Sequence, residues 1–196
     1  MLNKLFFSLS LLPVLVFSQN AIEKCNIQKS YFEDLYRVDA EDVKCLAKNS
    51  EKPNTVLVSF ARWCAPCLHH LPAHMALEKH FDVDFYILLV DKENDRRTFL
   101  AKDYVWKDYP NAKILIIKDY EKRGRGKKYN EFLKGITPPQ FEVIDSMSKF
   151  FVLNTKGEVQ MVTSYKDNPE GTDWKDHRPL MRKHIMPLLT PKEKSE

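Results

Sequence analysis

Apolar positions along this chain form short continuous runs that alternate with segments in which they recur every three or four residues. The clearest runs are 56–60, rich in β-branched and aromatic residues, and 83–90, with the sequence VDFYILLV; each has the length of a buried strand. A shorter run at 113–117 predicts a third strand. Segments of helical spacing cover residues 41–48, 64–81 and 95–106. Because strands and helices alternate for most of the length, we predict an α/β fold with a central sheet flanked by helices.

The C-terminal part of the chain adds a hairpin and a final helix to this pattern. Two apolar runs, 150–154 and 159–163, flank a glycine-containing turn and predict paired strands. The last helix falls within 173–189. Its regular part is expected to start at Pro179, because proline suits a first helical turn better than a helix interior. Weaker helical patterns lie at 30–38 and 129–133.

The first residues of the chain combine a basic start with the apolar run LFFSLSLLPVLVF. We predict a secretory signal peptide over 1–18, cleaved near Ser18 or Gln19. An uncleaved anchor helix is the alternative, but the run is shorter than the ~20 residues that span a bilayer, and Pro13 interrupts it. No later stretch is apolar enough to span a membrane, so we expect a periplasmic or otherwise extracytoplasmic protein without a transmembrane segment after cleavage.

Composition restricts the classes of function. The chain has 196 residues and is 43% hydrophobic, which suits one domain with a sizeable core. Its formal charge of +4 is mild and does not by itself indicate nucleic-acid binding, so no nucleic-acid partner is expected. The basic segment 121–128, EKRGRGKK, is interpreted as a solvated loop; a docking surface for an acidic partner is the alternative.

Cys64 and Cys67 follow the strand at 56–60 and open the helix at 64–81. Cys64 is therefore expected at a helix N-terminus, where unpaired amide donors and the helix dipole stabilise a thiolate. Cys67 lies one turn deeper and close enough to bond to Cys64. Pro66 costs little in a first helical turn and stiffens the loop between the sulfurs. This geometry suits reversible dithiol chemistry.

The segment 63–67, WCAPC, after a hydrophobic strand resembles the active site of the thioredoxin superfamily. Pro72, five residues after the second cysteine, resembles the helix-kinking proline of the extracytoplasmic TlpA and ResA type. The resemblance implies a thioredoxin-like mixed central sheet flanked by helices. The chain then divides into a signal peptide at 1–18, an N-terminal extension at 19–39, a thioredoxin-like domain at 40–189 with an insertion at about 107–147, and a polar tail at 190–196.

Thiol-disulfide exchange with protein thiols and disulfides is the activity that the resemblance implies. Cys64 would attack a partner disulfide, and Cys67 would then attack Cys64 to release the reduced partner, with Trp63 and Pro66 supporting the pair. Analogy with the family favours a reductant that receives electrons from a donor in the membrane or envelope. No cofactor or metal is implied.

Cys25 and Cys45 lie outside this motif. Thiols tend to be oxidised outside the cytosol, so the predicted export favours a structural disulfide between these two residues. Such a bond would tie the N-terminal segment to the helix at 41–48. The alternative is a pair of unbonded buried thiols.

Two positions near the cysteines depart from the family pattern. Val58 stands where thioredoxin has a buried aspartate that helps to move the proton of the second cysteine. His70 stands where the TlpA and ResA pattern has a glutamate, and a histidine there is expected to titrate near neutral pH. Our hypothesis is that His70 tunes the Cys67 thiol or accepts its proton; the alternative is a partly exposed histidine without a role.

Ser148 stands where the superfamily has a cis-proline that faces the cysteines. Pro110 and Pro139 are other candidates for that place. A cis bond before a residue other than proline costs ~3 kcal/mol, so we expect a trans bond before Ser148. If Ser148 takes this place, the edge that binds the partner is altered.

Two other classes of function remain open. Cys64, Cys67, His70 and His74 are four potential ligands for zinc or copper(I), which makes a metal-binding protein the first alternative. A non-catalytic interaction module that binds through the segment 121–128 or the N-terminal extension is the second.

Overall fold

A computed structural model describes residues 19–32, 34–119 and 125–192 of the chain. The predicted signal peptide at 1–18 and the last part of the polar tail, 193–196, lie outside the described residues. Among the residues that are described, no helix combines the length and the apolar character needed to cross a membrane.

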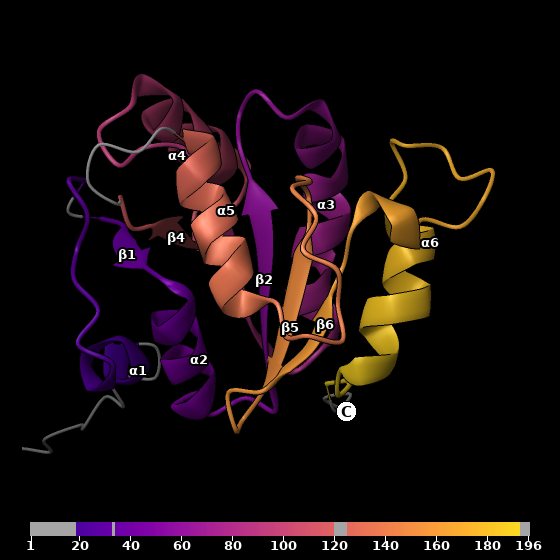
Figure 1. The fold of residues 1–196 in the computed structure, drawn as a ribbon, viewed down its shortest axis with the longest axis horizontal. Coiled ribbons are helices and arrows are strands. Elements are labelled where there is room, and N and C mark those ends of the chain that lie inside the picture. Colours follow the sequence, from indigo (N-terminus) through magenta and orange to yellow (C-terminus); the bar gives the residue numbers. More distant parts are fainter. Residues whose placement is uncertain (1–18, 33, 120–124, 193–196) are drawn as a thin grey trace, which may run out of the picture.

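A six-stranded mixed sheet forms the centre of the molecule (Figure 1). Its strands lie in the order β1-β4-β3-β2-β5-β6, with β1, β4, β3 and β2 parallel and with β5 antiparallel to both β2 and β6. The strands are β1 (Tyr36–Val38), β2 (Asn54–Phe60), β3 (Val83–Leu89), β4 (Lys113–Ile117), β5 (Phe150–Asn154) and β6 (Val159–Val162).

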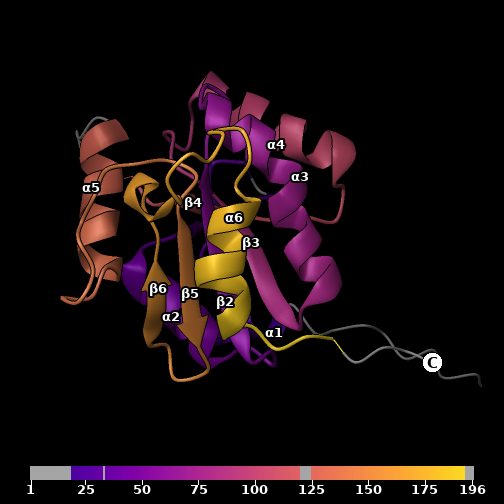
Figure 2. The same cartoon turned by 90° about the vertical axis from the view of Figure 1, so that its right-hand side faces the viewer.

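Helices cover both faces of this sheet. They are α1 (Gln19–Lys24), α2 (Ala40–Lys48), α3 (Ala65–His80), α4 (Arg96–Asp108), α5 (Arg125–Ile136) and the short α6 (Arg178–Leu180). After α6 the chain continues as a π-helical turn, Met181–Ile185, and a 3-10 turn, Met186–Leu188. Figure 2 shows α5 on one side of the sheet and α3 and α4 on the other, with α6 beside α3.

The core lies on both faces of β2, where every residue is buried. Phe151 of β5 meets Phe132 of α5 on one side, and the neighbouring Phe150 meets His74 of α3 on the other. A strand covered on both faces has a continuously apolar sequence. This explains why the positions of β2 and β3 could be predicted from the sequence. The observed architecture confirms the predicted α/β class with a thioredoxin-like mixed sheet flanked by helices.

The helix predicted within 30–38 is wrong. This segment supplies β1, which pairs with β4, and the main-chain N–H of Lys118 donates to the carbonyl of Val38. Without β1, the outer edge of β4 would expose unpaired amide and carbonyl groups. Main-chain pairing at that edge therefore outweighs the helical spacing of a few aromatic side chains.

The basic segment 121–128 is helical in the part that the structure describes. Residues 121–124 lie outside the described residues, and from Arg125 onward the chain is already α5, which extends well beyond the helical turn predicted at 129–133. Lys128 is buried with its Nζ atom 2.7 Å from the Asp119 carboxylate. The prediction of a solvated loop is therefore wrong for Lys128.

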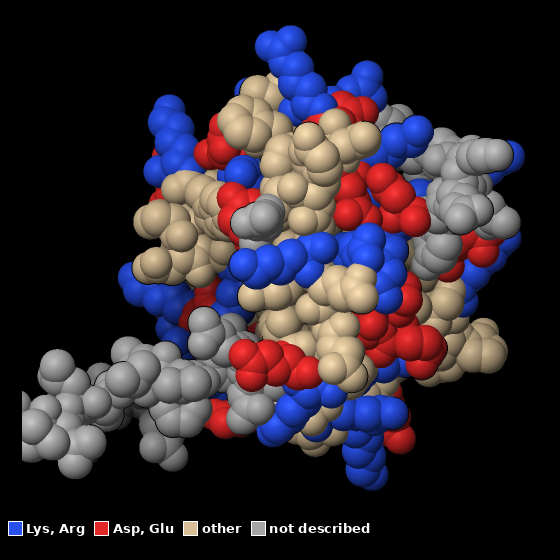
Figure 3. All heavy atoms as spheres, turned by 90° about the vertical axis from the view of Figure 1, so that its left-hand side faces the viewer, with Lys and Arg blue, Asp and Glu red and all other residues tan. Residues whose placement is uncertain are grey.

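Surface charge is mixed on the face shown in Figure 3, where basic and acidic side chains are interspersed. Ion pairs on the protein include Lys113 with Asp84 at 2.7 Å and Lys118 with Asp39 at 2.8 Å. The described residues therefore form no continuous basic surface on this face.

The segments expected to be peripheral take part in the fold. The N-terminal extension supplies α1 and β1, and the Sγ atoms of Cys25 and Cys45 are bonded at 2.07 Å, which joins this extension to α2. The expected insertion at 107–147 supplies β4 and α5. Pro191 of the expected polar tail pairs with Phe81 at the end of α3.

The final helix departs from a regular α-helix. It begins at Arg178, and Pro179 occupies its first turn, as the conformational preference of proline predicts. It then widens into the π-helical turn and ends in the 3-10 turn that contains Pro187. Proline cannot donate a main-chain hydrogen bond, which explains why a regular helix does not continue to the end of this segment.

Candidate active site

Cys64 is the N-cap residue of α3. Its Sγ atom accepts a hydrogen bond from the main-chain N–H of Cys67 at 3.1 Å. The two cysteines are joined by a disulfide, with their Cα atoms 5.2 Å apart. Pro66 lies in the first turn of the helix, where its missing N–H leaves no helical hydrogen bond unmade. The helix therefore directs an amide donor and its positive end at the sulfur of Cys64.

The two sulfurs differ in depth. Cys64 keeps 5% of its surface exposed and Cys67 keeps 1%, and the Sγ atom of Cys67 lies 3.7 Å from the carbonyl oxygen of Ser59 in β2. This order suits Cys64 as the sulfur that meets an incoming group and Cys67 as the sulfur that acts from below.

Trp63 stands beside the pair with 44% of its surface exposed. Its indole N–H donates to both carboxylate oxygens of Asp91, at 2.9 and 3.1 Å. Asp91 is buried just after β3, and its main-chain carbonyl accepts a hydrogen bond from the Nζ atom of Lys128 at 2.8 Å. Burial lowers the pKa of Lys128, and Asp119 opposes this by stabilising the charged form. This network fixes the end of β3 and the orientation of the Trp63 ring.

Ser148 lies in the loop that enters β5. The next residue, Lys149, exchanges two hydrogen bonds with Ser59: its N–H donates to the Ser59 hydroxyl, and its carbonyl accepts from the Ser59 N–H. Ser148 has φ of +60°, in the left-handed region that residues other than glycine rarely adopt. The described residues contain no cis peptide bond, so the bond before Ser148 is trans.

His70 lies on the side of α3 that faces this loop. Its Nδ1 atom is 2.7 Å from the hydroxyl of Ser148, and its Nε2 atom is 2.7 Å from the carbonyl oxygen of Trp174. A carbonyl only accepts, so Nε2 carries the proton and Nδ1 accepts the hydrogen bond from Ser148. His70 therefore joins the loop before β5 to the loop before α6.

This arrangement changes what was expected of His70. Both of its ring nitrogens are engaged by groups other than Cys67, so the geometry does not present it as the acceptor of the Cys67 proton. His70 is also buried, with 5% of its surface exposed, so it is not the partly exposed histidine of the alternative interpretation. Burial lowers the pKa of His70 below its ordinary value, so the expected titration near neutral pH moves to lower pH.

His177, which the sequence did not point to, lies against His70 and His74. The Nε2 atom of His74 is 2.8 Å from the Nδ1 atom of His177, and the rings of His70 and His177 stack with their centroids 4.2 Å apart. Burial lowers the pKa of His177 to about 3 and that of His74 well below its ordinary value. The structure thus groups His70 and His74 with His177, whereas the metal alternative grouped them with the cysteines.

Trp174 and Asp91 are further residues that the sequence patterns missed. Trp174 is 52% exposed, and its ring meets His69 of α3 edge to face, with the centroids 5.2 Å apart. The only local feature of the sequence that could have drawn attention to Trp174 is that a tryptophan stands in the polar segment 165–177. No sequence signal connects Asp91 to Trp63, because the two residues are 28 positions apart and only the fold brings them together.

No protein-family model matches the sequence, and no curated protein sequence matches it. Partial structural overlaps are found with several solved structures. A putative thiol-disulfide oxidoreductase from Bacteroides vulgatus is 20% identical, with a TM-score of 0.41 over 61% of this chain and 68% of that one. StoA from Bacillus subtilis is 16% identical, with a TM-score of 0.39 over 58% and 75%.

A thio-disulfide isomerase from Thermus thermophilus is 20% identical, with a TM-score of 0.40 over 68% of this chain and 77% of that one. Likeness at these identities and TM-scores carries no conclusion about activity. The assignment of the fold rests on the strand order and on the position of the cysteine pair at the start of α3.

Proposed function

We propose that the protein is a thiol-disulfide oxidoreductase that exchanges disulfides with protein partners through Cys64 and Cys67. The observation that carries this proposal is the hydrogen bond from the Cys67 N–H to the Cys64 sulfur at the N-cap of α3. The same donor and the helix dipole stabilise a Cys64 thiolate once the pair is reduced. A bonding partner, Cys67, lies one turn away.

The exchange proceeds in two displacements that balance in electrons. The Cys64 thiolate of the reduced protein attacks one sulfur of a partner disulfide, which forms a mixed disulfide and expels the other partner sulfur as a thiolate. The Cys67 thiolate then attacks Cys64, which forms the Cys64–Cys67 disulfide and releases the second partner thiolate. The partner gains two electrons and the protein loses two.

The second displacement requires Cys67 to lose its proton. Val58 supplies no acid or base at the place of the family's aspartate, and both nitrogens of His70 are bonded elsewhere. The thiolate expelled from the partner in the first displacement is formed just before Cys67 must lose its proton, and it can act as the base. We assign the Cys67 proton to that thiolate or to water.

One exposed tryptophan directly precedes the pair in the chain, and a second lies against the helix that carries the pair. Trp63 and Trp174 offer apolar surface to a protein partner, and Ser148 lies at the place that the family resemblance assigns to partner binding. Exposed apolar rings beside the start of α3 and against its side suit the docking of an extended, unfolded segment that carries a disulfide.

The proposal also covers where the protein is located and in which direction it exchanges disulfides. The predicted signal peptide and the resemblance to the TlpA and ResA type support an extracytoplasmic reductant that is recharged by an electron donor in the membrane or envelope. Direction is tested by equilibrating the pair with glutathione buffers: a reductant has a potential well below that of the extracytoplasmic space, and an oxidant has one near it or above.

Reduction of insulin by dithiothreitol tests the activity itself. The wild-type protein accelerates the precipitation of insulin chains, and Cys64→Ser abolishes the acceleration. The Cys25→Ser/Cys45→Ser double variant is the matched control, because it removes the other disulfide and is expected to keep the acceleration. The proposal fails if Cys64→Ser is as active as this control, or if the wild type has no effect.

A further inference from the structure

Three buried histidines from two segments meet on the side of α3 that faces the C-terminal helices. His70 and His74 are one turn apart on α3, and His177 immediately precedes α6. Each offers one ring nitrogen to a group in which all three atoms lie within 4.8 Å of one another. Each side chain is buried, with 5% or less of the residue exposed.

The protonation state of this group suits metal binding. Metal ions bind the neutral form of imidazole, and the Nδ1 atom of His70 already accepts a hydrogen bond from the Ser148 hydroxyl, which only an unprotonated ring nitrogen can do. His74 and His177 face each other nitrogen to nitrogen at 2.8 Å, so one of the two holds a proton that a metal ion can replace. Asp176 is the acidic group that acts on His70 and His177, and it is bonded to Arg178.

We propose that His70, His74 and His177 form a binding site for a zinc ion that joins α3 to the C-terminal helices. Three imidazole ligands with a fourth position open to water or the nearby Ser148 hydroxyl match the ligand set of zinc sites. Copper(I) prefers thiolate and thioether ligands, and none is part of this group. Because the cysteines are not ligands, zinc binds whether Cys64 and Cys67 are oxidised or reduced.

A small rearrangement completes the site. Tetrahedral zinc with Zn–N bonds of about 2.0–2.1 Å holds its nitrogens roughly 3.3 Å apart. His74 and His177 are already closer than this, and the widest separation in the group shortens by at most about 1.5 Å. His70 turns to present a nitrogen and gives up its bond to Ser148 or to the Trp174 carbonyl.

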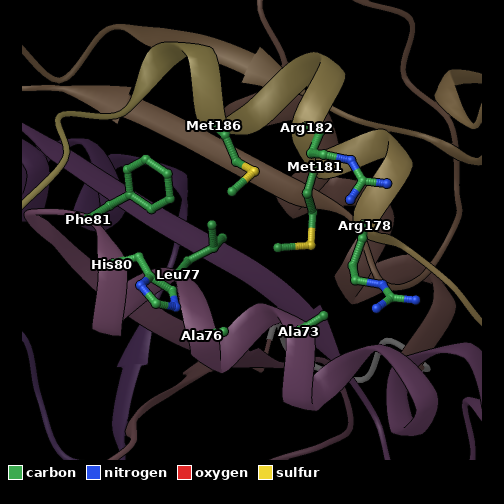
Figure 4. Close-up of a pocket in the computed structure, with 9 residues that line it drawn as sticks. All are labelled: Ala73, Ala76, Leu77, His80, Phe81, Arg178, Met181, Arg182 and Met186. Atoms are coloured by element: carbon green, nitrogen blue, oxygen red, sulfur yellow. The ribbon is translucent and has the colours of Figure 1, made fainter.

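The packing next to the group leaves room for this movement. A mostly apolar pocket lies between α3 and the C-terminal helices, with Met181 and Met186 on one wall and Leu77 on the other (Figure 4). Methionine side chains are flexible and refill irregular space when their neighbours move. This pocket is therefore the place where a shift of the C-terminal helices toward α3 can be taken up.

Zinc binding is tested on the Cys64→Ser/Cys67→Ser variant, which has no thiols at the pair and no exchange activity. After treatment with a chelator and its removal, calorimetric titration with Zn²⁺ is expected to give one ion per chain. X-ray absorption of the zinc-loaded variant is expected to show nitrogen or oxygen ligands at about 2.0 Å with three imidazoles and no sulfur. This test does not depend on the exchange activity, so either proposal can fail while the other stands.

Single variants identify the ligands. His74→Ala and His177→Ala, each in the Cys64→Ser/Cys67→Ser background, are expected to weaken zinc binding by at least the roughly 10–100-fold that loss of an outer-shell partner of a metal ligand costs. His80→Ala is the matched control, because His80 is exposed on the same helix outside the group. If a ligand variant fails to fold, the X-ray absorption spectrum of the folded Cys64→Ser/Cys67→Ser protein decides whether three imidazoles bind the zinc ion. The proposal is overturned if no zinc binds or if fewer than three imidazole ligands are found. It is also overturned if His177→Ala and His80→Ala bind zinc equally well.

Discussion

The hydroxyl of Ser148 donates to the Nδ1 atom of His70 across 2.7 Å, although the two residues are 78 positions apart in the sequence. This bond fixes a serine whose φ of +60° is unfavourable for any residue with a side chain. It also connects α3, which carries the cysteine pair, to the loop that enters β5. Ser148 and His70 therefore hold the loop beside the pair in place.

Ser148→Ala is expected to lower the free energy of unfolding by about 1–3 kcal/mol, because it leaves a buried ring nitrogen of His70 without a donor. Ser148→Gly loses the same bond but relieves the backbone strain, so its loss is smaller. Urea denaturation measures both. Ser146→Ala is the control, because the buried hydroxyl of Ser146 has no hydrogen-bond partner among the residues that the structure describes. Equal stability of Ser148→Ala and Ser146→Ala would show that the bond contributes nothing.

Lys149 gives a prediction about pH. It is 1% exposed, its Nζ atom donates to the Thr163 carbonyl, and burial lowers its pKa from 10.5 to about 8 despite Asp167, Asp145 and Glu142. Between pH 8 and pH 10.5 the unfolded chain therefore binds more protons at this residue than the folded one, so stability rises with pH.

Lys149→Met removes this effect. The free energy of unfolding of the wild type is expected to gain about 3 kcal/mol relative to Lys149→Met as the pH rises from about 8 to 10.5. Thermal or urea unfolding of both proteins across that range gives the difference, and groups common to both cancel. A difference that does not change with pH, or one that changes in the opposite direction, contradicts a depressed pKa at Lys149.

The disulfide between Cys25 and Cys45 closes a short loop, because its cysteines are 20 residues apart. Cys25→Ser/Cys45→Ser is expected to lower the free energy of unfolding by about 3 kcal/mol, mainly because the unfolded chain gains freedom. Urea denaturation of oxidised protein measures the change. The prediction is contradicted if the double variant is as stable as the wild type, or if free-thiol titration finds these two cysteines reduced in the native protein.

The elements that a short stretch of sequence determines were predicted well. The buried strand β2, the two cysteines and the start of α3 follow one another directly, so their arrangement depends on local geometry alone. The strands β3 and β4 and the β5–β6 hairpin were located within one or two residues for the same reason. In each case a continuous apolar run marked a strand covered on both faces or paired in a hairpin.

Several features that depend on distant contacts were not predicted. The segment 30–38 has helical spacing, but the free edge of β4 recruits it as a strand. Lys128 belongs to a basic run, and the positions of the Asp119 carboxylate and the Asp91 carbonyl explain why this lysine points inward. His177 joins His74 across 103 residues, a pairing that no periodicity reveals.

Asp91 is expected to orient Trp63 for partner docking. Asp91→Ala removes the carboxylate that accepts the indole N–H and is expected to lower kcat/KM for insulin reduction severalfold. Asp91→Asn retains an acceptor oxygen and is expected to lose less. Circular dichroism confirms that each variant is folded before its rate is compared. Full activity of Asp91→Ala would mean that the orientation of Trp63 does not matter.

The central claim is that the N-terminus of α3 stabilises a thiolate at Cys64. The most direct test is the rate of Cys64 alkylation by iodoacetamide as a function of pH, in fully reduced protein, with the modified residue identified by mass spectrometry. We predict an apparent pKa well below that of an ordinary cysteine thiol and faster alkylation of Cys64 than of Cys67 at neutral pH. An apparent pKa at or above the ordinary value, or preferential alkylation of Cys67, contradicts the claim.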